Sequence, residues 1–255
     1  MARESAYLPV FFGDLPTGGD LIELAGAEGQ HAVRVRRVRV GESIRIADGD
    51  GQYADCTVTE LQQRALLARI VDRGSVPERT PRLVVVQALA KADRGTLAVE
   101  LLTEIGVDEI VPWQAAHSVA RWDGKEAKAR ERWVQVAREA AKQSRRTRVP
   151  RIGELVRGAR VAERCQGRQT VVLHESATEP ISDVLLKQAQ DEVILVVGPE
   201  GGIAADELDA LRAGGAHIAS LGPEVLRTST AGVVGATWAS IALGRWKRGH
   251  SGQGD

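Results

Sequence analysis

The chain has 255 residues, 43% hydrophobic and 27% charged, a composition typical of a soluble globular protein with one large or two ordinary domains. Its 34 basic and 34 acidic residues cancel, so the net charge predicts no partner. Cys56 and Cys165 lie far apart, which argues against a disulfide scaffold or a cysteine zinc site and fits a reducing cytosol. No stretch is apolar enough for a signal peptide or a membrane span, so we expect a cytoplasmic protein.

Residues 1–76 have the pattern of a small β domain. The sequence Asp-Gly-Asp-Gly at 48–51 predicts a hairpin turn between two strands. Residues 28–38 break the pattern and predict a short helix that carries a cluster of arginines. We expect a small β-barrel or sandwich with one helix. The predicted strands are 21–24, 43–47, 53–58 and 66–71.

The pattern changes after residues 74–82, which contain two prolines and form the best predicted linker. Strands and helices then alternate to the C-terminus, which is typical of an α/β domain with a mainly parallel sheet. The predicted strands are 83–89, 108–112, 170–174, 193–197 and 217–221. The predicted helices start after Asp93, cover 124–144, start at Ser182, follow residues 198–202 and cover 230–243. The helix after Asp93 is expected to place Leu97, Leu101, Leu102 and Ile105 on one face.

Two glycine-containing loops follow neighbouring predicted strands, Gly198–Gly202 after one and a loop from Gly222 after the other. Open α/β sheets bind ligands beyond the carboxyl ends of their strands, where glycine allows the backbone to approach a ligand closely. A single Gly-Pro-Glu-Gly-Gly turn is explained equally well by a purely structural role. Two such loops together favour a pocket of backbone amides and carbonyls that suits a purine or adenosine.

The common signatures of other enzyme classes are absent from the sequence. There is no GxxxxGK[ST] phosphate loop, no GxGxxG after the first strand of the α/β region and no GxSxG nucleophile turn. The five histidines are scattered without metal-ligand spacing, so we predict no metal site.

Residues 120–151 contain eleven basic and four acidic side chains, a net charge of +7. Pairs such as Glu126 and Arg130 explain the first part as a solvated helix face. From Lys142 to Arg151 no acid is present, which favours contacts with the phosphates of a nucleic acid. Arg34, Arg36, Arg37 and Arg39 form a second cluster that could clamp the same nucleic acid, with simple solvation as the alternative. The predicted RNA-binding residues are Arg34, Arg36, Arg37, Lys142, Arg145, Arg146 and Arg148.

Four motifs together resemble the RsmE family: GPEGG at 198–202, LGPEVLRTSTA at 221–231, KADRGTLAVELLTEIGV at 91–107 and REAAKQSRRTRVP at 138–150. HAVRVRRVRVGE at 31–42 resembles the N-terminal PUA-like domain of that family. The resemblance covers nearly the whole chain in the right order. Members are SPOUT-class methyltransferases that methylate the N3 atom of a uridine in small-subunit (16S) ribosomal RNA.

The resemblance implies a PUA-like RNA-binding β-barrel in residues 1–76. It implies a SPOUT domain in residues 77–255, an α/β fold with a mostly parallel sheet flanked by helices and a deep C-terminal trefoil knot. It also implies a homodimer, with S-adenosyl-L-methionine bound in the knot near the subunit interface. The predicted cofactor residues are Leu173, His174, Glu175, Gly198, Pro199, Gly201, Gly202, Leu221, Gly222, Leu226 and Thr228.

The chemistry of the implied reaction points to two catalytic residues. Uracil N3 must lose its proton, and the negative charge then spreads onto two carbonyl oxygens, which a guanidinium can stabilise bidentately. We therefore predict Arg227 as the charge-stabilising residue. Glu200 is the predicted base or base-positioning group, with a loop carboxylate that bonds local amides as the alternative. Ser229 stands where the family usually has an acidic residue.

Two other functions stay open at the level of the sequence. A related SPOUT enzyme could methylate a ribose 2′-hydroxyl, although the N-terminal barrel and the Leu-Arg-Thr turn argue against it. A non-catalytic RNA-binding factor for ribosome assembly is the second alternative. The expected partner in every case is small-subunit ribosomal RNA or the assembled subunit.

Overall fold

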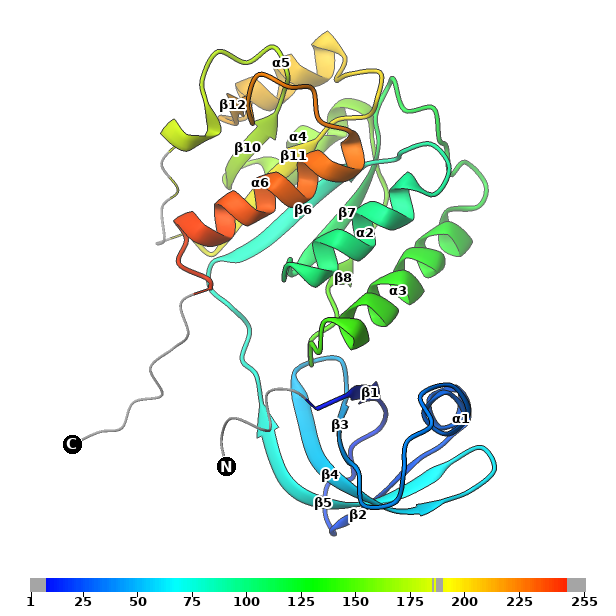
Figure 1. Ribbon diagram of the computed structural model, residues 1–255. Coiled ribbons are helices and arrows are strands. Elements are labelled where there is room, and N and C mark those ends of the chain that lie inside the picture. Colours follow the sequence, from blue (N-terminus) through cyan, green and yellow to red (C-terminus); the bar gives the residue numbers. More distant parts are fainter. Residues whose placement is uncertain (1–7, 185, 187–189, 247–255) are drawn as a thin grey trace, which may run out of the picture. The chain divides into compact units, whose positions relative to one another are not determined.

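The computed structural model describes residues 8–184, 186 and 190–246, and the chain divides into two units (Figure 1). The first unit contains Met1–Glu78 and Ala137–Val149, and the second contains Arg79–Val136 and Pro150–Asp255. No helix among the described residues has both the length and the apolar content needed to cross a membrane.

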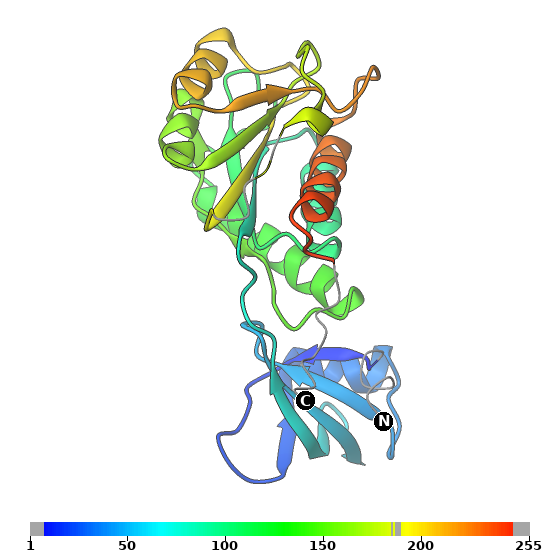
Figure 2. The ribbon, with the colours of Figure 1, turned by 90° about the vertical axis from the view of Figure 1, so that its left-hand side faces the viewer.

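The first unit is built on a curled five-stranded sheet (Figure 2). Its strand order is β1-β3-β4-β5-β2, antiparallel except for the parallel pair β1 and β3. Alternate side chains point inward, as in β2, and Phe11, Ile44 and Leu66 belong to the core they enclose. The strands are β1 (Val10–Phe12), β2 (Leu21–Leu24), β3 (Ser43–Ala47), β4 (Gln52–Leu61) and β5 (Leu66–Ser75).

The predicted arginine-bearing helix of this unit is shorter and less regular than expected. α1 (Gly26–Gln30) continues into a π-helical turn, η2 (His31–Val35). Arg37 has a positive φ of 56°, a conformation incompatible with a continuing helix, so the helix ends before the predicted residue 38.

The second unit is built on a parallel sheet with the order β12-β10-β11-β6-β7-β8, in which β9 also pairs with β7. The central strands are buried along almost their whole length, which explains their continuous apolar sequence. The strands are β6 (Arg82–Ala88), β7 (Glu109–Gln114), β8 (Arg151–Ile152), β9 (Val156–Arg157), β10 (Gln169–Leu173), β11 (Glu192–Val197) and β12 (His217–Ala219).

Helices cover both faces of this sheet (Figure 2). On one face α6 contacts β6, β11 and α2, and on the other α4 and α5 pack with Val84 and Val196 in one core. The helices are α2 (Arg94–Glu104), α3 (Glu126–Gln143), α4 (Val161–Cys165), α5 (Ala205–Ala213) and α6 (Thr228–Ala242), with 3₁₀ turns η3 (Gly158–Arg160) and η4 (Ile181–Asp183).

Three local expectations were wrong. α2 buries Ala98, Val99 and Leu102, whereas Leu97 is 43% exposed, so its buried face is rotated from the predicted one. The expected helix from Ser182 is a 3₁₀ turn, and its continuation falls partly on residues outside the described ranges. The sequence pattern did not predict α4.

The strand order explains why the two glycine-containing loops meet. β10 lies between β11 and β12 and runs parallel to both. The chain therefore leaves Leu173, Val197 and Ala219 at one edge of the sheet, where open α/β sheets bind ligands.

Candidate functional site

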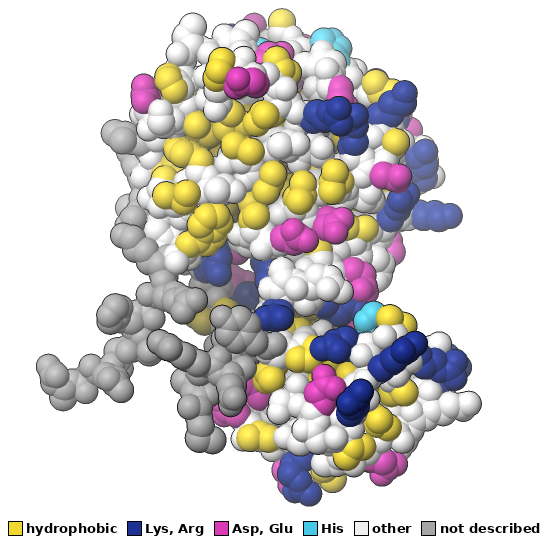
Figure 3. All heavy atoms as spheres, in the orientation of Figure 1, with side chains coloured by type: hydrophobic (Ala, Val, Ile, Leu, Met, Phe, Trp, Pro, Cys, Tyr) yellow, Lys and Arg dark blue, Asp and Glu magenta, His cyan; other side chains and the backbone are white. Residues whose placement is uncertain are grey.

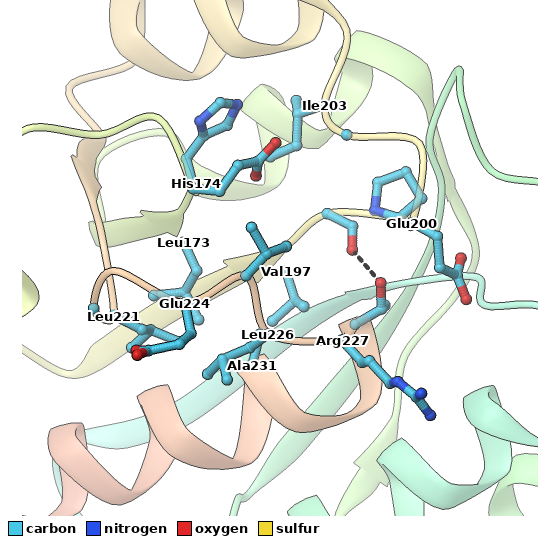
Figure 4. A pocket seen from close by; sticks show the side chains of 17 residues that line it. Leu173, His174, Val197, Glu200, Ile203, Leu221, Glu224, Leu226, Arg227 and Ala231 are labelled. Carbon is cyan, nitrogen blue, oxygen red and sulfur yellow. Dashed lines mark hydrogen bonds between the residues drawn. The ribbon is translucent and has the colours of Figure 1, made fainter.

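A cavity of about 260 Å³ lies at that edge of the sheet (Figure 4). Its walls come from the chain after β10, the loop after β11 and the segment from Leu221 to the first turn of α6. The lining residues are Leu173, His174, Glu175, Val197, Gly198, Pro199, Glu200, Gly202, Ile203, Leu221, Gly222, Glu224, Val225, Leu226, Arg227, Thr228 and Ala231.

One hydrogen bond joins the two loops directly. The Thr228 hydroxyl donates to the Gly198 carbonyl oxygen at 3.0 Å, as the dashed line in Figure 4 shows. The buried Gln87 amide of β6 lies 3.4 Å from the Thr228 carbonyl oxygen. The start of α6 is therefore tied both to the loop after β11 and to the central strand.

The loop after β11 is packed tightly enough to require glycine. A Cβ added at Gly198 would lie only 2.7 Å from Cγ1 of the buried Ile203 side chain. Gly202 has a φ of +78°, which L side chains rarely adopt. These two positions bring the backbone itself to the wall of the cavity.

A buried carboxylate fixes the far end of the same loop. Glu207 in α5 is fully buried, and its oxygens accept hydrogen bonds from the backbone N–H groups of Ala204 at 3.1 Å and Ala116 at 2.8 Å. Ala204 precedes α5, whereas Ala116 belongs to the segment after β7. Glu207 thus caps its own helix and anchors a second loop to it.

His174 is held by its neighbour Ser176. The Ser176 N–H donates to His174 Nδ1 at 3.2 Å, and the Ser176 hydroxyl lies 2.9 Å from the same atom. Because Nδ1 accepts a hydrogen bond, the neutral imidazole carries its proton on Nε2. His174 therefore offers one hydrogen-bond donor at the rim of the cavity.

Ten of the eleven predicted cofactor residues line the cavity, all except Gly201. Gly201 is exposed, and its carbonyl oxygen lies 3.1 Å from Nδ1 of His117 instead. Five further lining residues were not predicted, although each lies within two residues of a predicted one or one helical turn from it, which was the available signal. They are Val197, Ile203, Glu224, Val225 and Ala231.

The predicted catalytic residues Glu200 and Arg227 both line the cavity. Figure 4 shows their side chains at the same end, beyond the hydrogen bond that joins the loops. Glu200 Oε1 accepts a hydrogen bond of 3.3 Å from the Lys91 backbone N–H, the local-amide contact considered as the alternative to a catalytic role. Arg227 is exposed at the N-cap of α6.

The predicted RNA-binding residues belong to the first unit and differ in their surroundings. Arg34, Arg36 and Arg37 are exposed, and Arg36 lies 3.8 Å from Glu42. Arg145 is exposed at a positive φ of 57°, and Arg146 is partly exposed. Arg148 donates to the Val76 carbonyl oxygen at 2.7 Å.

Lys142 differs from the other predicted RNA contacts. Its side chain is only 7% exposed, and its ammonium lies 2.9 Å from Glu28 and 2.6 Å from Glu139. This buried ion pair stabilises the packing of α3 on α1 within the first unit. The charge of Lys142 is therefore already paired within the first unit.

Comparisons with known proteins agree with this architecture. A family model described as an RNA methyltransferase domain matches residues 77–240, and one described as an RNA methyltransferase PUA domain matches residues 24–71. The chain is 45% identical to ribosomal RNA small subunit methyltransferase E of Mycobacterium bovis, covering 93% of each chain. It is 30% identical to the protein of that name from Bacillus subtilis, covering 82% of this chain and 85% of the relative.

The fold is shared with a solved structure. Ribosomal RNA small subunit methyltransferase E from Neisseria gonorrhoeae, bound to S-adenosyl methionine, superposes with a TM-score of 0.80 over 92% of this chain and 98% of that one, at 23% identity. The predicted fold class, a SPOUT-type α/β domain with an N-terminal PUA-like domain, is confirmed. The chain belongs to the RNA methyltransferase family that includes the ribosomal RNA small subunit methyltransferase E proteins.

Proposed function

We propose that this protein methylates the N3 atom of one uridine in small-subunit (16S) ribosomal RNA, with S-adenosyl-L-methionine as methyl donor. The observation that supports this most directly is the cavity at the ends of β10 and β11, with Glu200 and Arg227 at one end. The relatives named above supply the class of substrate. Residues 1–76 would form the PUA-like RNA-binding domain and residues 77–255 the catalytic SPOUT domain.

The lining of the cavity fits the proposed cofactor. Leu173, Val197 and Ile203 offer apolar contacts for a purine ring, and the close-packed backbone at Gly198 offers amide and carbonyl groups. Glu175 and Glu224 add two carboxylates, which suit ribose hydroxyls and the positive charges of the donor. When bound, the cofactor supplies a sulfonium methyl group that needs no further activation.

The chain's own residues have two tasks in this reaction. Uracil N3 must lose its proton before its lone pair can bond to the methyl carbon, and Glu200 is the proposed acceptor or positioning group for that proton. The negative charge left on the two uracil carbonyl oxygens needs hydrogen-bond donors, and the Arg227 guanidinium provides two in one plane. The exposure of Arg227 leaves it accessible to an RNA base entering from solvent.

Basic side chains of the first unit are proposed to bind the phosphates of the RNA. Arg34, Arg36, Arg37, Arg145, Arg146 and Arg148 are the proposed phosphate contacts of the first unit. The proposed substrate is small-subunit ribosomal RNA within the assembled subunit. The proposed site of action is the cytoplasm.

A homodimer is part of the proposal. α6 exposes Val234 and Ile241, at 39% and 64%, and α2 exposes Leu97. Figure 3 shows hydrophobic side chains gathered over the face of the second unit that α6 forms. Exposed apolar side chains that gather on one face are typical of an interface between copies of a chain. Sedimentation equilibrium that gave a monomer mass at micromolar concentration would contradict this part.

The experiment that tests the function uses small ribosomal subunits from a strain that lacks the corresponding gene. After incubation with the protein and isotope-labelled S-adenosyl-L-methionine, the RNA is digested and its nucleosides are identified by mass spectrometry. We expect labelled 3-methyluridine. Label in a ribose methyl group would indicate the related 2′-O-methyltransferase, and absence of cofactor binding in calorimetry would indicate a non-catalytic assembly factor.

A further inference from the structure

The second unit has another hollow, of about 530 Å³, outside the proposed cofactor cavity. It lies between the segment after β6, the start of α2, the loop before α3 and the first turns of α3. Its lining residues are Leu89, Ala90, Ala92, Gly95, Thr96, Val119, Ala120, Arg121, Trp122, Lys125, Lys128, Ala129, Arg132 and Trp133.

The floor of this hollow is apolar and fixed in place. Trp122 and Trp133 are 8% and 4% exposed, and their rings pack edge to face with centroids 5.0 Å apart. The Trp122 backbone N–H donates to Gln114 Oε1 at 2.9 Å, which ties the loop to the end of β7. Leu89 and Ala90 complete the buried surface. Only a small part of each indole is exposed, so a flat base would pack on the surface that the two tryptophans form together with Leu89 and Ala90.

The rim carries four cations. Arg121 and Lys125 come from the loop before α3, and Lys128 and Arg132, four residues apart, share one face of the first turns of α3. Figure 3 shows Lys and Arg side chains gathered at the edge of the second unit where α3 begins. Lys125 and Lys128 are exposed, and neither has an ion pair with a residue that the structure describes.

The nearby acids neutralise this face only in part, because Asp123 offsets some of the charge of Arg121. Glu126 accepts from Arg157 at 2.6 Å, and Glu131 accepts from Gln135 at 2.7 Å, so both carboxylates are engaged away from the rim. Arg132 lies 3.5 Å from Asp93, but both side chains are well exposed, so the pair is weak. The rim therefore keeps an excess of positive charge over an apolar floor.

The hollow adjoins the proposed catalytic end of the first cavity through one short segment. Leu89, Ala90 and Ala92 line the hollow, while the N–H of Lys91 between them donates to Glu200. Ala92 has a φ of +53°, an uncommon and strained conformation for alanine. A chain held in the hollow would therefore pass beside Glu200.

We propose that this hollow binds a nucleotide of single-stranded RNA next to the target uridine, with its base on the tryptophan floor and its phosphates at the rim. This rests on the function proposed above. Cations around an aromatic floor are the combination with which proteins hold unpaired nucleotides, whose bases are free to leave the stack. The carboxylates of an acidic peptide would pair with the cations of the rim but would make no contact with the apolar floor.

The charge of the rim is tested with Lys125→Ala/Lys128→Ala. We expect the slope of log K against log salt for RNA binding to become shallower by about 1.4, because each phosphate contact with a single strand contributes about 0.7. Cofactor affinity, measured by calorimetry without RNA, should stay unchanged. The matched control is Arg160→Ala/Arg212→Ala, which removes two exposed cations of the same unit outside both cavities and should leave the slope unchanged.

The floor is tested separately with Ala129→Leu, which fills the hollow from α3 without changing the charge and with little change in helix propensity. RNA affinity should fall several-fold while the salt slope stays as in the unsubstituted protein. The denaturation midpoint of each variant checks that the fold is retained. Equal RNA affinity in the unsubstituted protein and both test variants would overturn the proposal.

Two outcomes separate this inference from the proposed function. If the unsubstituted protein methylates its substrate but both variants bind RNA normally, only the nucleotide site is wrong. If the unsubstituted protein transfers no methyl group, the proposed methyltransferase function is wrong, whatever RNA affinity the variants have. If the double variant binds naked RNA normally but no longer binds the assembled subunit, the rim contacts a ribosomal protein and the proposal is wrong.

Discussion

The two cavities of the second unit differ in the groups that form them. The cavity at the ends of β10 and β11 is walled by loops, and its shape depends on backbone groups near Gly198 and Gly202. The hollow beside α3 is walled by helix faces and a loop, and its character depends on four cationic side chains over two indoles. One is suited to a ligand held at fixed distances, the other to a charged polymer held along its length.

The two sites should therefore be damaged by different substitutions. A site built from backbone is damaged by added atoms, because there is no side chain to move aside. A site built from exposed charge loses affinity with each charge that is removed, and its affinity depends on salt.

The largest effect is expected for Arg227→Ala. Removal of the donor proposed to stabilise the uracil oxygens should lower turnover about 10²- to 10³-fold, the usual effect of losing such a donor. Cofactor affinity should change little, because the Arg227 side chain is exposed at one end of that cavity. Single-turnover assays measure the rate of methyl transfer, and calorimetry measures the cofactor affinity. Normal turnover would exclude the role, and loss of cofactor binding would reassign Arg227 to the cavity wall.

Glu207→Gln should affect both cavities at once. The carboxylate accepts N–H groups from Ala204, beside the first cavity, and Ala116, on the loop that leads to the second. An amide accepts only one of them, so a buried N–H loses its partner at a cost of about 1–3 kcal/mol. Chemical denaturation should show that loss, with weaker cofactor and RNA binding. Asp209→Asn, on the same helix but 74% exposed, is the control and should be neutral.

Gly198→Ala should weaken the first cavity alone. The new methyl group would meet Ile203 at 2.7 Å, so the loop must shift away from the ligand. We expect about a tenfold weaker cofactor affinity, equivalent to about 1.4 kcal/mol, with an unchanged salt slope for RNA. Gly18→Ala is the matched control, since nothing lies within 4 Å of its added Cβ. Tighter or equal cofactor binding would show that the loop accommodates the added methyl group without moving away from the ligand.

The smallest effect on the fold is expected for Arg132→Ala. Its contact with Asp93 joins two side chains that are 67% and 93% exposed. The free energy of unfolding should therefore change by less than about 0.5 kcal/mol. RNA binding should still weaken and lose about 0.7 from its salt slope. A stability loss above 1 kcal/mol would mean that the rim is structural.

The first cavity was largely predictable because its signals are local in sequence. A buried strand followed by Gly and Pro marks a loop at a strand end, and parallel strands bring such loops together. Gly201 is the predicted cofactor residue that does not line the cavity, and its carbonyl oxygen lies against His117, 84 residues earlier in the chain. The sequence spacing of glycines does not reveal which of them faces the ligand.

The second hollow was not predictable in the same way. The cations at its rim were visible as part of a basic stretch, but their excess charge depends on Glu126 pairing with Arg157, 31 residues away. Lys142 shows the converse, because it is neutralised by Glu28, 114 residues earlier in the chain. The sign of the charge on a surface depends on such long-range partners, and no local sequence pattern specifies them.

The hydrogen bond from Thr228 to Gly198 has a consequence for the rate of the catalytic cycle. It holds one end of the first cavity closed, and separating the loops there would cost about 1 kcal/mol in addition to lost packing. At the other end, residues 222–225 are exposed. The spent cofactor should therefore leave past residues 222–225, and the residence time of the product should depend on how freely that short segment moves.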